Sequence, residues 1–164
     1  MIEIRVYGTP APQGSKARGR HGGVYEMSKR VGPWRAAVTA ATRQALEEAR
    51  IYLPSGGFTS QPEVLELGRS EAKAVTVVFL MARPVSHWRR TRTINQLRAD
   101  APTRPATRPD LDKLVRSTLD GLKAGGAYGD DGQVTDLMAA KCYARPGDQP
   151  GAIIRIEPCK TEDY

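Results

Sequence analysis

The stretch RPDLDKLVRSTLDGL, residues 108–122, has the clearest helical pattern in the chain. Its apolar side chains and one threonine recur at helical spacing and predict a buried face: Leu111, Leu114, Val115, Thr118, Leu119 and Leu122. Pro109 suits the start of a helix, and Asp110 beside it favours the positive helix end. Asp112 and Arg116 are four residues apart on another face, where they can pair. The sequence therefore predicts an amphipathic helix whose charged face points away from the core.

Patterns outside this helix predict both strands and a second helix. Residues 2–7 alternate between apolar and polar side chains, which is typical of a half-buried strand. Residues 32–50, GPWRAAVTAATRQALEEAR, have helical periodicity, with Trp34 as an expected core anchor. Residues 74–84, AVTVVFLMARP, predict a buried strand, and residues 133–144, QVTDLMAAKCYA, have a strand-like pattern.

The composition limits the size of the protein and the kind of partner it has. A chain of 164 residues is long enough for one hydrophobic core and too short for two, so a single domain over 1–164 is expected. The net charge of +7 and the isoelectric point of about 9.7 favour a polyanionic partner, although a GC-rich genome would also produce this arginine-rich balance. The chain has neither a run of roughly 18 apolar residues nor the features of a signal peptide. A soluble, cytoplasmic protein without a membrane partner is therefore expected.

Two segments rich in arginine, glycine and proline are expected to be mobile basic loops. The first, PAPQGSKARGRHGG at about 10–23, carries Lys16, Arg18 and Arg20. The second, at about 84–108, has little periodicity and carries Arg89, Arg90 and Arg92. Both are interpreted as candidate contacts to a nucleic-acid backbone, with a solvated loop as the alternative.

The acidic residues are unexpected in so basic a chain. Asp110 and Asp112 can reach a common ligand if Asp110 lies at or before the first helical turn. Asp130 and Asp131 occupy a glycine-rich turn that could return beside the start of the helix. Three such carboxylates would suit Mg²⁺ or Mn²⁺, which could activate water against a phosphodiester. The alternative is structural: a helix cap at Asp110, an intrahelical pair for Asp112 and an ordinary turn.

These acidic blocks resemble the RusA family of Holliday junction resolvases, many of which are encoded by phages and prophages. The resemblance rests on RPDLDKLVRSTLDGL followed by AYGDDGQV, which are similar to the family's Asp-x-Asp-Asn, downstream Lys, Leu-Asp-Ala-Leu and Asp-Asp-x-Gln-Val pattern. GTPAPQGSKARGR, the helix of Trp34 and ARPVSHW add weaker matches. The family implies an α/β (α+β) fold with a small mixed sheet and packed helices. It also implies a homodimer that cuts two opposing strands of a four-way DNA junction with Mg²⁺, or with Mn²⁺ in its place.

The resemblance also assigns roles to particular residues. The metal-binding and catalytic aspartates are Asp110, Asp112 and Asp131, while Asp130 is a helper or a turn residue. The family's catalytic lysine is replaced by Arg116, which can bind phosphate but does not readily give up a proton. The family's Asn after the second Asp is replaced by Lys113, which could contact DNA or supply the proton instead.

Phosphate contacts are further expected from the two basic loops and from Lys141 on the strand after Asp131. If the gene belongs to a phage, the protein would act in the cytoplasm of the bacterial host. Two other functions stay open at this level. One is a nuclease that prefers flaps, replication forks or RNA, and the other is a junction-binding protein without catalytic activity.

Overall fold

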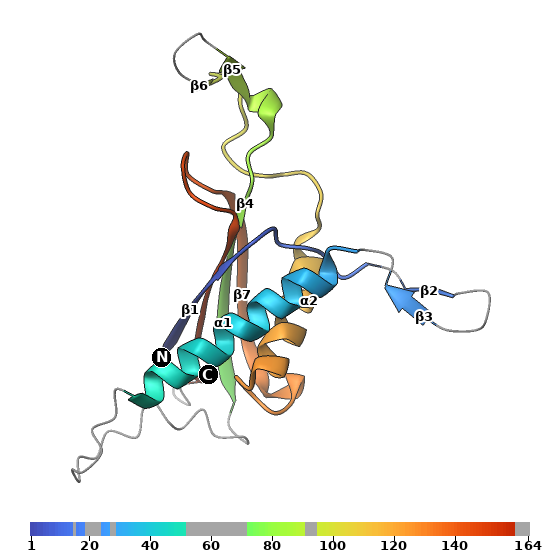
Figure 1. Ribbon diagram of the computed structural model, residues 1–164, viewed down its shortest axis with the longest axis vertical. Coiled ribbons are helices and arrows are strands. Elements are labelled where there is room, and N and C mark those ends of the chain that lie inside the picture. Colours follow the sequence, from blue (N-terminus) through green and yellow to red (C-terminus); the bar gives the residue numbers. More distant parts are fainter. Residues whose placement is uncertain (15, 19–23, 27–28, 52–71, 91–94, 160–164) are drawn as a thin grey trace.

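The computed structural model describes residues 1–14, 16–18, 24–26, 29–51, 72–90 and 95–159 (Figure 1). Four strands form a mixed sheet in the order β1-β8-β4-β7: β1 Ile2–Tyr7, β4 Lys73–Met81, β7 Val134–Tyr143 and β8 Gly151–Pro158. β8 is antiparallel to both β1 and β4, whereas β4 and β7 are parallel. A parallel pair requires a crossover connection, and this one contains helix α2, Leu111–Gly125. The expected α+β class with a small mixed sheet is confirmed.

One face of the sheet packs against two helices, α1 Val31–Ile51 and α2. Alternate residues of three strands point to this face and are buried: Ile2, Ile4 and Val6 of β1, Val75, Val77 and Phe79 of β4, and Ala152, Ile154 and Ile156 of β8. This alternation is the two-residue period of a strand with one covered face. Leu114 and Leu122 of α2 and Val38 of α1 complete the core from the helical side. The core therefore fixes α2 against the sheet and leaves its polar face outward.

The contact between α1 and α2 depends on two glycines. A Cβ atom on Gly121 would lie 2.8 Å from the Cβ of Val38, and one on Gly125 would lie 2.5 Å from the Cβ of Thr42. The two backbones therefore approach more closely than larger residues would allow. The expected core anchor, Trp34, is 2% exposed, and its Nε1 donates a hydrogen bond to Thr118 Oγ1 at 3.1 Å. This contact fixes α2 along the axis of α1.

The segments expected as irregular loops contain regular structure. Three residues of the first, β2 Lys16–Arg18, form an antiparallel pair with β3 Val24–Glu26, which lies just after it. Residues of the second form the 3₁₀ turn η2 Val85–His87 and a second pair, β5 Trp88–Arg90 with β6 Asn95–Leu97. Both ribbons stand away from the central sheet (Figure 1). The prediction of loops at 10–23 and 84–108 was wrong for these residues because cross-strand pairing lies beyond local periodicity.

Candidate active site

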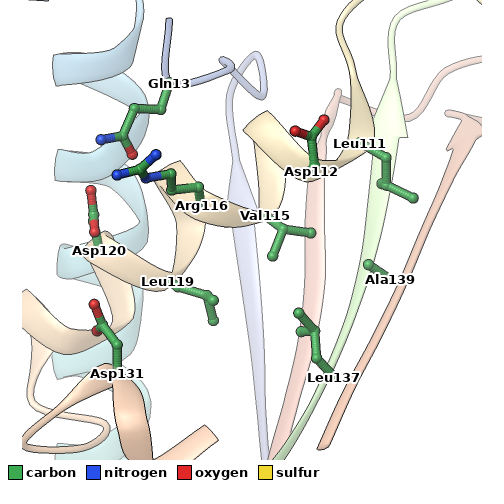
Figure 2. A pocket seen from close by; sticks show the side chains of 10 residues that line it. All are labelled: Gln13, Leu111, Asp112, Val115, Arg116, Leu119, Asp120, Asp131, Leu137 and Ala139. Atoms are coloured by element: carbon green, nitrogen blue, oxygen red, sulfur yellow. The ribbon is translucent and has the colours of Figure 1, made fainter. Parts of the chain in front are cut away.

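Helix α2 forms one wall of an open pocket of about 710 Å³ (Figure 2). The opposite wall belongs to β7, and further residues come from the segment before β2 and from the 3₁₀ turn η3, Asp131–Gln133. The residues that line it are Gln13, Leu111, Asp112, Val115, Arg116, Leu119, Asp120, Asp131, Leu137 and Ala139. The pocket thus combines an apolar floor with three carboxylates and one guanidinium. It is the part of the described chain that contains Asp112, Asp131 and Arg116 of the predicted site.

Asp112 and Asp131 line the same pocket, but they lie toward opposite ends of it (Figure 2). Asp112 is exposed on the first turn of α2 and forms neither an ion pair nor a hydrogen bond with the described residues. Asp131 Oδ1 lies 3.8 Å from Lys123 Nζ. Within the described ranges, no three acidic, histidine or cysteine side chains lie close enough to hold a metal ion together.

Asp110 occupies the N-cap position of α2 without making a side-chain cap hydrogen bond. Its Oδ2 instead lies 3.1 Å from Lys113 Nζ, and this partner lowers the pKa of the Asp110 carboxyl. Lys113, expected to contact DNA, is thus paired with one of the expected metal ligands. Asp110 is absent from the pocket lining, so the first two acids of the motif have different surroundings.

The two acids of the turn have different roles: Asp130 stabilises the turn, and Asp131 faces the pocket. Asp130 Oδ1 accepts a hydrogen bond from Gly132 N at 2.9 Å, while Gln133 Oε1 accepts from Asp130 N at 3.0 Å. This reciprocal arrangement is a capping box at the start of η3. The bond from Gly132, followed by the contact with Lys123 Nζ at 3.2 Å, lowers the pKa of Asp130. Asp130 therefore shapes the turn that presents Asp131 to the pocket.

Arg116 is exposed toward the pocket and does not form the expected ion pair with Asp112. Its guanidinium lies beside the amide of Gln13 (Figure 2). Gln13 reaches this place because its backbone N–H donates to the carbonyl of Lys113 at 3.0 Å. Ser117 Oγ also donates to the carbonyl of Ala11 at 2.6 Å, which holds the same segment along α2. Gln13 was not predicted from the sequence, because a single polar residue in a glycine- and proline-rich stretch has no distinctive pattern.

Asp120 also lines the pocket but is already paired across the helix interface. Its Oδ2 contacts Arg35 Nη2 of α1. The sequence did contain a signal for this position, since Asp120 follows Arg116 by four residues on the same helical face. Tyr128 is buried next to this part of the helix, and its hydroxyl donates to the carbonyl of Leu119 at 2.9 Å. Burial, and then the charges of Asp131 and Asp120, raise the pKa of Tyr128.

The expected DNA contacts are distributed over the two ribbons and β7. Lys16 and Arg18 occupy β2, in register with Glu26 and Val24 of β3. Arg89 and Arg90 occupy β5, where Arg89 is exposed. Arg20 and Arg92 lie outside the described residues. Lys141 differs from the others, because its Nζ donates to the backbone carbonyls of Thr107 and Pro109 at 2.7 and 2.8 Å.

Comparison with known proteins bears on this site. A family model described as endodeoxyribonuclease RusA matches residues 7–157, which include both helices, strands β4 and β7, all but the last residue of β8 and only the last residue of β1. No curated protein matches the chain. Among the described helices, none is both long enough and apolar enough to cross a membrane.

Proposed function

Because the chain belongs to the RusA family of endodeoxyribonucleases, which are phosphodiester hydrolases acting on Holliday junctions, we propose that it resolves four-way junctions by metal-dependent paired hydrolysis. The pocket between α2 and β7 is the proposed site. The observation that carries this assignment is the carboxylate of Asp112, which has no partner among the described residues and shares the pocket with Asp131 and Arg116. A carboxylate left without a cation in a chain of net charge +7 is suited to an added cation.

The donor chemistry of the pocket fits the metal dependence that is general in the family. Mg²⁺ and Mn²⁺ accept carboxylate oxygens, and Mg²⁺ commonly uses one or two carboxylates while water and phosphate oxygens complete its shell. Asp112 and Asp131 are the proposed ligands, and Asp110 joins them if it separates from Lys113. When bound, such an ion supplies activation of water and stabilisation of the departing oxygen.

The remaining side chains of the pocket have roles that their chemistry supports. Arg116 is proposed to bind two non-bridging oxygens of the scissile phosphate through its planar guanidinium. It does not readily donate a proton, so protonation of the departing oxygen is assigned to Lys113 or to water. We expect Arg116→Lys to raise the turnover rate, because lysine can donate a proton. We expect Lys113→Ala to lower the turnover rate, because it removes the proposed proton donor. Unchanged turnover in both variants would contradict this division of roles.

A homodimer is the second part of the proposal. A four-way junction is close to two-fold symmetric, and a C₂ dimer presents the same surface twice. The separation of Asp112 from Asp131 within one chain supports such a dimer (Figure 2). If a two-fold axis sets the pockets of two chains face to face and antiparallel, the Asp112 end of one pocket lies against the Asp131 end of the other. Asp112 of one chain then approaches Asp131 of the partner subunit. Leu137, 49% exposed on the pocket wall, supplies apolar surface for this contact.

Mixing two inactive variants tests the shared site. Asp112→Asn and Asp131→Asn homodimers are each expected to be inactive. A mixture that exchanges subunits would contain heterodimers with one intact site, so nicking of a labelled junction should return. Continued inactivity after verified subunit exchange would show that each chain builds its site alone.

Cleavage of a labelled four-way junction tests the function itself. We expect paired nicks in opposing strands with Mg²⁺, and none with a chelator or with Asp131→Asn. Asp148→Asn is the matched control, because Asp148 is exposed in the turn between β7 and β8. Preference for flaps, forks or RNA in the same assay would favour the alternative nuclease. Tight binding without nicks under any metal would identify an inactive junction-binding protein.

The basic ribbons account for affinity in this proposal. Arg89 on β5 and the positions of Lys16 and Arg18 on β2 are proposed phosphate contacts. Such contacts release counterions, so binding should weaken steeply with salt and depend little on sequence. Arg89→Ala is expected to reduce the slope of log affinity against log salt by about 1. An unchanged slope would exclude Arg89 from the phosphate contacts.

A further inference from the structure

Lys141 lies on β7 with its ammonium group directed to the main chain that precedes α2. Its Nζ donates to the carbonyl of Thr107 at 2.7 Å and to the carbonyl of Pro109 at 2.8 Å. The position of Lys141 pairs with Phe79 of β4, whose side chain is fully buried in the core. The backbone of Lys141 is therefore held in the sheet. Its side chain reaches the carbonyls of the two residues on either side of Arg108.

The segment that Lys141 holds leads directly to the acidic motif. Figure 1 shows the chain between β6 and α2 descending from the ribbon to the start of the helix. Pro109 has no backbone N–H, and the carboxylate of Asp110 does not cap the helix. In the described part of the chain, the carbonyls of Thr107 and Pro109 accept no hydrogen bond from other backbone groups. Lys141 supplies the hydrogen bonds that fix this segment to the sheet.

We infer that Lys141 is a positioning residue for Asp110 and Asp112, and not a contact to DNA phosphates. Asp110 follows Pro109 directly, and Asp112 lies on the first turn that Asp110 begins. Small displacements of ligands weaken metal sites, and groups that orient ligands from behind typically affect affinity by about 10- to 100-fold. The inference rests on the proposed metal site at these carboxylates.

The chemistry of lysine suits this role. An ammonium group has three donors that rotate about one bond, so it can serve two carbonyls in different directions. Arginine retains the charge, but its planar fork cannot occupy the same point between both oxygens. A lysine whose donors are already directed at two protein carbonyls also has less capacity to bind a phosphate.

The test compares Lys141→Met and Lys141→Arg with the wild type and with Lys29→Met. Lys29 is an exposed lysine in the turn before α1, so its replacement removes the same charge without removing the hydrogen bonds to Thr107 and Pro109. Binding of Mn²⁺ to the DNA-free protein is measured by calorimetry, and junction affinity is measured with chelator over a series of salt concentrations. Thermal unfolding of each variant confirms that it is folded.

A positioning role predicts Mn²⁺ binding weakened by about 10-fold in Lys141→Met and less in Lys141→Arg. Junction affinity and its salt dependence should equal those of Lys29→Met or the wild type. Unchanged Mn²⁺ binding would overturn the inference, whether or not junction affinity falls. If Lys141→Met does not fold, Mn²⁺ binding by Lys141→Arg is compared with that of the wild type, and unchanged binding again overturns the inference. Failure of the wild type to cleave junctions would refute the proposed function alone, because the Mn²⁺ measurement requires no substrate.

Discussion

Replacement of Gly125 by alanine should loosen the contact between α1 and α2. The added Cβ would lie 2.5 Å from the Cβ of Thr42 and 2.7 Å from its Cγ2. Neither atom is the end of a long side chain, and Thr42 is fixed by a hydrogen bond from its Oγ1 to the carbonyl of Val38 at 2.8 Å. The helices must therefore separate to admit the methyl group.

The expected magnitude follows from two opposing effects. Overpacking of a core costs about 1–3 kcal/mol, whereas alanine in place of glycine inside a helix contributes about 1 kcal/mol of stability. The contact at Gly125 is short enough to place its overpacking cost near the upper end of that range, at about 3 kcal/mol. After the gain from alanine, we expect Gly125→Ala to lower the free energy of unfolding by about 2 kcal/mol. For Gly121→Ala the contact with Val38 is longer, at 2.8 Å, and we expect about 1 kcal/mol.

Equilibrium unfolding in urea measures these losses. With a slope of about 2 kcal/mol per molar urea, Gly125→Ala should lower the midpoint by about 1 M. Gly32→Ala is the matched control, because nothing lies within 4 Å of a Cβ at that position. It should be neutral or slightly stabilising. A Gly125→Ala midpoint equal to that of the control would refute the close-approach argument.

Three other expectations concern surface charge, the turn and the dimer. The hydrogen bond from Arg98 lowers the pKa of Asp100 to about 2, so Arg98→Met should return that pKa towards 3.8 in an NMR titration. Because the folded pKa is lowered, any stability from this pair is present above about pH 4 and is lost as the pH falls towards 2. Tyr128→Phe removes the bond to Leu119 and should cost about 1 kcal/mol in denaturant unfolding. Leu137→Glu should dissociate the proposed dimer in sedimentation experiments, whereas Met138→Glu, on the opposite sheet face, should not.

Local patterns predicted the elements whose own residues show one buried face. The strand over 2–7, the strand that begins near 74 and the helix of Trp34 are present close to the expected bounds. The strand β8 was not predicted, although AIIRI in residues 152–156 contains the same alternation. Its central place between β1 and β4 depends on long-range pairing that periodicity does not describe. The ribbons were missed for the same reason.

The motif spacing identified the residues of the pocket better than it identified their partners. Asp112, Arg116 and Asp131 do share one pocket. The sequence could not show that Lys113 pairs with Asp110, because several cations lie within reach of that carboxylate. Gln13 depends on a tertiary contact, in which a segment 100 residues away donates to the carbonyl of Lys113. Ion-pair partners and loop contacts therefore require the folded chain.

The pairing of the acids explains why the electrostatics of the pocket favour one carboxylate. Asp110 is paired with Lys113, and Asp120 is paired with Arg35. Lys123 lies closer to Asp130, at 3.2 Å, than to Asp131, at 3.8 Å. Among the acids of this site, Asp112 is the one that forms no ion pair with the cations the structure describes. An added divalent ion thus gains most at Asp112, and a phosphate bound at Arg116 would approach that ion instead of a bare carboxylate.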